Sequence, residues 1–180
     1  MLLDRNRSLL LVIDVQERLL AAMPEAADCV DRILLLLEGA RLLGVPALSS
    51  EQYPKGLGTT DPRVSAALGN APRFEKIHFS CFREEPLRQA ILATGRRQLV
   101  LCGVEAHVCV LQTALDFRAT GFDVHVVADA CDSRTAQRKA LAFARLRQEG
   151  VRILDSEMVL FEWLERAGTD EFRAISRLVR

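Results

Sequence analysis

The most informative pattern in the chain lies between residues 99 and 116. A run of apolar residues, Leu99–Cys102, is typical of a buried strand, and Gly103 interrupts it. From Glu105 onward the apolar residues recur at helical spacing, which places Cys109 in the first turns of a helix. A thiol there lies near unpaired backbone N–H groups and the positive end of the helix dipole, which lower its pKa. The pattern therefore predicts a reactive cysteine.

Short apolar runs alternate with helical spacing along most of the chain. We expect strands at residues 8–13, 45–49, 73–76, 98–102, 123–129 and 151–154. Helices are expected at 27–43, 86–93, 105–120 and 135–149, and a short helix should begin at 61–62. Residues 51–60 should form a loop. The segment from residue 156 onward should be helical, with a break at 168–169. This order predicts an α/β fold, a three-layer sandwich whose six-stranded, mostly parallel sheet is covered by helices on both faces, in a single domain spanning 1–180.

Composition narrows the classes of function. The 180 residues contain 24 basic and 24 acidic residues, which does not favour a nucleic-acid partner. No signal-peptide pattern is apparent and no apolar run is long enough to span a bilayer, so no membrane association is expected. Five cysteines, an odd number without a C-x-x-C motif, favour a reducing compartment, and we expect the protein to be cytoplasmic.

Three chemically active segments follow predicted strands. The carboxyl ends of parallel strands share one edge of the sheet, so Asp14, Lys76 and Cys109 should converge there. Asp14 follows five apolar residues, and burial would raise its pKa unless a cation lies nearby. The alternative for such a residue taken alone is a helix cap or a surface turn. Lys76 would hold a thiolate or carboxylate in its charged form, although a lone lysine is more often an ordinary edge-strand residue.

The remaining candidates are one histidine, three phenylalanines and four cysteines. His107 lies two residues from Cys109, so on a helix the two side chains diverge, and we interpret His107 as a pocket or surface residue. Phe79 would line a pocket or belong to the core, together with Phe74 and Phe82. The other cysteines are interpreted as structural: Cys29, Cys81, Cys102 and Cys131.

The motifs around these residues resemble the isochorismatase-like cysteine hydrolase superfamily, which includes nicotinamidases. They are L-V-I-D-V-Q at Asp14, E-K-I-H-F-S-C-F at Lys76 and G-V-E-A-H-V-C-V-L-Q-T-A at Cys109, and the resemblance extends from Ser8 to about Leu160. The loop E-Q-Y-P-K-G-L-G, starting at Glu51, is most similar to the isochorismatase domain-containing hydrolases.

The resemblance implies an Asp14–Lys76–Cys109 catalytic triad. It also implies a cis peptide bond at Val104–Glu105, which with the Cys109 N–H would help to bind an oxyanion. The implied function is hydrolysis of a small amide-type C–N bond through a thioester-type intermediate, acting on a small-molecule substrate. The substrate pocket would be lined by Gln16, Tyr53, Phe79 and His107.

Two departures from relatives refine this expectation. The loop after the second strand lacks the Asp and His cluster of nicotinamidases, and His78, His107 and His125 lack metal-ligand spacing, so we predict neither a metal nor a cofactor. The presence of Cys109 favours amide hydrolysis over the vinyl-ether hydrolysis of true isochorismatases. Alternatives are a non-catalytic scaffold or binding protein, a vinyl-ether hydrolase, and a peroxide-sensing thiol.

The resemblance also implies a homo-oligomer. The apolar segment 157–164 would supply an interface, or would instead pack on the protein's own sheet.

Overall fold

Successive side chains of the central strands face opposite sides of the sheet, and both sides are apolar. In β1 (Ser8–Ile13), Leu10 and Val12 enter one core, whereas Leu9, Leu11 and Ile13 enter the other. Strands buried on both faces in this way are typical of a parallel sheet covered by two helical layers. The computed structural model, which describes residues 2–180, has this three-layer α/β arrangement.

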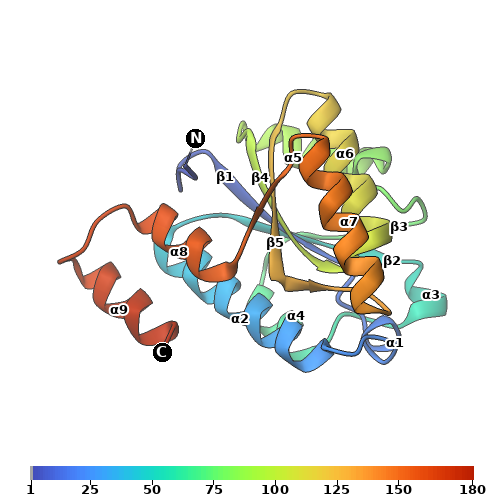
Figure 1. The fold of residues 1–180 in the computed structure, drawn as a ribbon, viewed down its shortest axis with the longest axis horizontal. Helices are drawn as coiled ribbons and strands as arrows, with labels where there is room; N and C mark the ends of the chain where they lie inside the picture. Colours follow the sequence, from blue (N-terminus) through green and yellow to red (C-terminus); the bar gives the residue numbers. More distant parts are fainter. Residues whose placement is uncertain (1) are drawn as a thin grey trace.

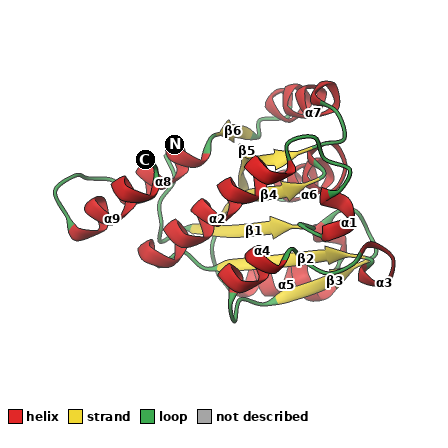
Figure 2. Cartoon of the chain, turned by 90° about the horizontal axis from the view of Figure 1, so that it is seen from below, coloured by secondary structure: helices red, strands yellow, loops and turns green. Residues whose placement is uncertain are grey.

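All six strands belong to one sheet with the order β3-β2-β1-β4-β5-β6, and every neighbouring pair is parallel. The other strands are β2 (Ala47–Gln52), β3 (Arg73–Lys76), β4 (Gln98–Val104), β5 (Asp123–Asp132) and β6 (Arg152–Leu154). Their carboxyl ends point to one edge, where two short helices lie, α1 (Glu17–Leu20) and α3 (Pro54–Leu57) (Figure 2).

The longer helices form the two outer layers. One layer contains α2 (Ala26–Leu43), α4 (Pro62–Leu68), α8 (Ser156–Leu164) and α9 (Asp170–Leu178). The other contains α5 (Glu85–Ala93), α6 (Leu111–Ala119) and α7 (Ala136–Gln148). Helix α9 lies beyond α8 at one end of the molecule (Figure 1). None of the helices in residues 2–180 is long and apolar enough to cross a membrane.

A close approach of β1 and β4 fixes the edge where the strands end. Gly103 has φ +117°, and a Cβ atom at this position would lie 2.1 Å from the carbonyl oxygen of Ile13. Only glycine allows this contact and this backbone conformation together. The glycine that interrupts the apolar run therefore brings β4 against the residue that precedes Asp14.

Several predicted boundaries are corrected by the structure. The second strand covers 47–52 and not 45–49, because the Val45 N–H still bonds to the Ala40 carbonyl as part of the end of α2. The predicted loop 51–60 contains the end of β2 and the short helix α3, which starts at Pro54. Strand β5 extends beyond residue 129 to Asp132, where it pairs with Val104 after an irregularity in register.

Candidate active site

Asp14 is the first residue after β1 and is fully buried. The Ser50 hydroxyl donates to its Oδ1 at 2.7 Å, and the Lys76 ammonium lies 2.7 Å from its Oδ2. Burial raises the pKa of Asp14, and the positive charge of Lys76 opposes this without cancelling it. The carboxylate is consequently a better proton acceptor than an ordinary aspartate.

Lys76, the last residue of the edge strand β3, is buried and not an exposed edge lysine. Besides Asp14, its Nζ donates to Gln52 Oε1 at 2.5 Å and to the backbone carbonyl of Phe79 at 3.0 Å. Burial, the largest single influence, lowers the pKa of Lys76, but the charge of Asp14 and the hydrogen bond to it, together with Cys81 and Cys109, outweigh burial and the pKa is raised. Lys76 therefore carries a positive charge at neutral pH, and its three N–H groups have partners.

Cys109 occupies a wide turn between β4 and α6. The sequence predicts one helix over 105–120, but residues Ala106–Val110 form a π-helical turn and the α-helix starts at Leu111. The N–H groups of Val108 and Val110 both bond to the Glu105 carbonyl. Single π-turns of this kind occur often at functional sites, because they redirect a side chain without ending the helix.

The predicted effect of the helix end on the Cys109 pKa is wrong. Burial, and then the negative charge of Asp14, raise the pKa of the thiol well above its ordinary value, although Lys76 opposes this. In this conformation Cys109 is a protonated thiol close enough to Asp14 for that charge to raise its pKa, and only a small part of its side chain is exposed. A thiol with so high a pKa has to lose its proton to a neighbouring base before it can act as a nucleophile, and the Asp14 carboxylate is such a base.

Gln52 links the parts of this site and is absent from the sequence-based candidates. It ends β2 and is buried; its Oε1 accepts from Lys76 and lies 4.0 Å from Cys109 Sγ. Its Nε2 donates to the Ile77 carbonyl at 2.7 Å, which fixes the orientation of the amide. Its position as a polar residue at the carboxyl end of a strand beside β1 is the signal that would have identified it.

Cys81 also faces this cluster. Its thiol bonds to the Ser50 hydroxyl at 3.6 Å, and burial raises its pKa to about 11. The sequence interpretation of Cys81 as structural thus misses its place beside the Asp14–Lys76 pair. All five cysteines are free and buried.

The Val104–Glu105 peptide bond is cis and immediately precedes the Cys109 turn. Arg134 donates to the Glu105 carboxylate at 2.7 Å, which fixes that side chain away from the buried cluster. The turn that carries Cys109 directly follows β4, and β4 pairs with β1, the strand that ends beside Asp14. The backbone N–H groups of the turn therefore lie at the same edge of the sheet as Asp14.

The four residues predicted to line a substrate pocket have different environments. Gln16 is fully buried, and its amide bonds to the backbone of Gln52 and Gly58, so it holds the loop after β2. Tyr53 and Phe79 are about half exposed on either side of Lys76 along the chain. His107 is partly buried with its Nδ1 3.0 Å from Ser133 Oγ; burial, helped by nearby arginines, lowers its pKa.

A small cavity lies beside Lys76. It has a volume of about 220 Å³ and is lined by residues that include Tyr53, Ile77 and Glu84. Phe74 packs against the core and Phe82 stacks edge-on against Phe117, which leaves Phe79 as the exposed member of the three phenylalanines. Within residues 2–180 no group of three or more His, Cys, Asp or Glu side chains is arranged to hold a metal ion.

The sheet topology and the buried Asp–Lys–Cys cluster define a three-layer α/β protein with its polar centre at the carboxyl edge of the sheet. Residues 8–158 match the model of the isochorismatase domain, and the chain belongs to this family of isochorismatase-like hydrolases.

Relatives extend along nearly the whole chain. The secreted isochorismatase effector Isc1 of Phytophthora sojae is 38% identical, over 97% of this chain and 85% of that protein. Mouse isochorismatase domain-containing protein 2A is also 38% identical, over 96% of this chain and 82% of that protein.

Solved structures share the fold. The MAR1 ribonuclease of Caenorhabditis elegans has a TM-score of 0.93 at 33% identity, covering 99% of this chain and 92% of that one. The YcaC gene product of Escherichia coli, described as an octameric hydrolase of unknown specificity, has a TM-score of 0.93 at 26% identity, covering 99% and 90%.

Proposed function

We propose that this protein is a cysteine hydrolase that cleaves a small amide-type C–N bond with Asp14, Lys76 and Cys109. The observation that carries the proposal is the buried contact of 2.7 Å between Lys76 Nζ and Asp14 Oδ2, with the Cys109 thiol near enough for both charges to act on its pKa. A base of raised pKa beside a thiol, and a fixed cation beside both, are the groups that a covalent acyl transfer requires.

The first half-reaction forms a thioester. Asp14 takes the thiol proton as Cys109 Sγ bonds to the substrate carbonyl carbon, and the carbonyl electron pair moves to oxygen. Backbone N–H groups of the Cys109 turn would stabilise that oxyanion. When the carbonyl re-forms, the C–N bond breaks, and the leaving amine takes the proton held by Asp14.

The second half-reaction returns the enzyme to its starting state. Asp14 takes a proton from water, the oxygen attacks the thioester carbon, and the C–S bond breaks. Cys109 Sγ recovers the proton from Asp14, and the products are a carboxylic acid and an amine. Lys76 keeps its proton throughout, because its raised pKa suits a fixed cation that stabilises Asp14 whenever that group is charged.

The experiment is a panel of small amides, carbamates, nitriles and esters, compared between the wild type and Cys109→Ser. Turnover that is lost in Cys109→Ser, with an acyl adduct on Cys109 detected by mass spectrometry, is the expected result. Turnover that persists in the variant contradicts the nucleophile. A vinyl ether and an RNA oligonucleotide belong in the panel, the latter because a similar structure is named a ribonuclease.

The oligomeric state and the cellular location of the protein are also proposals. We propose a homo-oligomer, since the E. coli neighbour is described as octameric, and a cytoplasmic location, which the five free thiols favour. We further propose catalysis without a metal or cofactor; metal analysis of the purified protein, with activity measured after chelation, tests this.

A further inference from the structure

Helix α7 presents a basic surface with an apolar centre. Its only charged residues are basic: Arg138, Lys139, Arg145 and Arg147. Arg138, Leu141 and Arg145 follow one another at spacings of three and four, so they share one side of the helix. Leu141 is 64% exposed, and neither Arg138 nor Arg145 forms an ion pair within residues 2–180.

A groove of about 250 Å³ lies on this side of α7. It is lined by Leu141, both arginines, Leu111 and Ala142, and by His107 from the turn that carries Cys109. We call this the α7 surface. An apolar side chain from a partner would fill the groove, and acidic groups on either side would meet the two guanidinium groups.

Helix α8 presents a surface of the opposite charge. Its own charged residues, Glu157 and Glu162, are acidic, and Asp155 and Glu165 flank it. Glu157 lies one helical turn before Phe161 on the same side of α8. Glu165 follows the end of the helix with φ +65° and lines the same hollow as Phe161, so a carboxylate lies beside the exposed aromatic ring in each direction along the chain. Met158 is 51% exposed and Phe161 38% exposed.

The α8 surface is also hollowed. Met158 and Phe161 line a cavity of about 710 Å³, together with Leu2 and Glu165, and a second of about 290 Å³ beside Asp155 and Glu157. The opposite side of α8 is fixed in the protein's own core. Trp163 is fully buried, and Gly39 of α2 lies so close to α8 that a Cβ atom there would meet Leu160 Cδ2 at 2.1 Å. Helix α8 thus packs on its own core with one side and exposes Met158 and Phe161 on the other.

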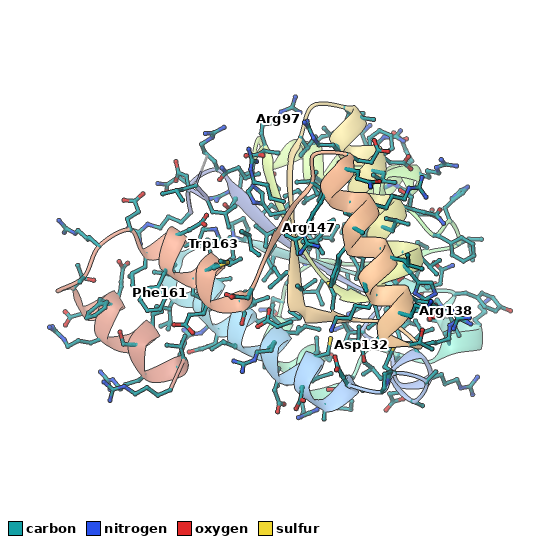
Figure 3. The ribbon with its side chains drawn as sticks, in the orientation of Figure 1. Arg97, Asp132, Arg138, Arg147, Phe161 and Trp163 are labelled. Atoms are coloured by element: carbon teal, nitrogen blue, oxygen red, sulfur yellow. The ribbon has the colours of Figure 1, made fainter. Side chains whose placement is uncertain are left out.

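We propose that the α7 surface of one copy of this chain binds the α8 surface of a second copy. The two surfaces are similar in layout and opposite in charge, with arginines on either side of Leu141 on α7 and glutamates on either side of Phe161 along α8. Because both surfaces belong to the same chain, a second copy presents an acidic surface to the basic α7 surface and a basic surface to the acidic α8 surface. Figure 3 shows Arg138 on α7 and Phe161 on α8, at separate places on the molecule.

This contact pairs unlike surfaces, as in a heterologous interface or in a symmetric dimer where each copy contributes both surfaces. Because His107 lines the α7 groove, the contact would also cover one side of the turn that holds Cys109. The interface does not depend on the proposed hydrolysis, and its test uses no substrate.

Charge reversal tests the pairing directly. We compare the mass in solution of the wild type, of Arg138→Glu/Arg145→Glu, and of Glu157→Arg/Glu165→Arg, by light scattering after size exclusion. The expected results are an oligomer for the wild type and the mass of one chain, 20.1 kDa, for each double variant. An equal mixture of the two variants should associate again, because the acidic α8 surface of the first now faces the basic α7 surface of the second.

A matched pair on the same helix controls for folding and for total charge. Arg145→Glu should weaken association at least about tenfold, whereas Arg147→Glu should not, because a separation of two residues turns its side chain to the other side of α7 and it does not line the groove. Circular dichroism and melting temperature report whether each variant folds. A wild type at 20.1 kDa, double variants that keep the wild-type mass, or a mixture that does not associate would each overturn the proposal.

Discussion

The ammonium of Lys76 and the carboxylate of Asp14 are in contact at 2.7 Å, and both side chains are wholly sealed from solvent. The two residues are far apart in the sequence and come from opposite sides of β2, which lies between their strands in the sheet. A buried pair of this kind stays charged only because each partner compensates the other.

Removing one partner should therefore destabilise the fold. Lys76→Met leaves an uncompensated carboxyl group in the core, and we expect a loss of about 3–5 kcal/mol in the free energy of unfolding. Asp14→Leu/Lys76→Met removes both charges and should recover most of this loss. Urea denaturation measures both variants, and a double variant no more stable than Lys76→Met would contradict compensation by the pair.

The two partners should have opposite effects on the Cys109 thiol. Asp14 raises the pKa of Cys109 and Lys76 lowers it, so Asp14→Asn increases the thiolate fraction at a given pH and Lys76→Met decreases it. We expect iodoacetamide to label Cys109 faster in Asp14→Asn and slower in Lys76→Met. Peptide mass spectrometry at pH values from about 7 to about 10 gives the rates across the range in which thiols titrate.

The rate of substrate hydrolysis should not change in parallel with the rate of Cys109 labelling. Asp14→Asn has no base, so we expect its hydrolysis to fall by about 10²–10⁴ while its labelling accelerates. In the wild type, labelling should be slower than that of a free thiol near neutral pH and should still rise in alkaline solution, because the raised pKa keeps the thiol protonated. Equal changes in labelling and turnover would argue against Asp14 as the base.

Gln52 should set the electrostatic environment between Lys76 and Cys109. Gln52→Glu places a negative charge at the position that is now 4.0 Å from Cys109 Sγ, so it should raise the pKa of the thiol further and slow its labelling. Gln52→Met removes the amide without adding charge and serves as the control for lost hydrogen bonds. If both variants label at the same rate, the charge at this position has no influence on Cys109.

Gly103 should be more sensitive to substitution than a comparable glycine. Gly103→Ala forces a Cβ atom against the Ile13 carbonyl, whereas a Cβ atom added at Gly121, which has φ +83°, would meet no other atom within 4 Å. Gly121→Ala should cost about 1–2 kcal/mol through its backbone conformation alone. Gly103→Ala should cost more and should also reduce turnover, because it displaces β1 beside Asp14; equal losses of stability in thermal melts would contradict the close approach.

Much of the architecture follows from local patterns in the chain. The alternation of apolar strands with amphipathic helices predicts the six strands, and the parallel sheet follows because such units cover both of its faces. The rule that parallel strands end at one edge predicts that Asp14 and Lys76 approach each other, and the structure places them in contact. These inferences need only the sequence on either side of each residue and the general rules for packing strands and helices.

The tertiary structure alone decided the electrostatics. From the sequence, Cys109 has a helix end beside it and a lowered pKa; in the structure a π-helical turn, burial and the charge of Asp14 raise that pKa instead. Gln52 and Cys81 likewise enter the site because strand order places β2 and the segment after β3 around Asp14. A pKa depends on desolvation and on charges within a few ångströms, and those distances join residues that the sequence keeps far apart.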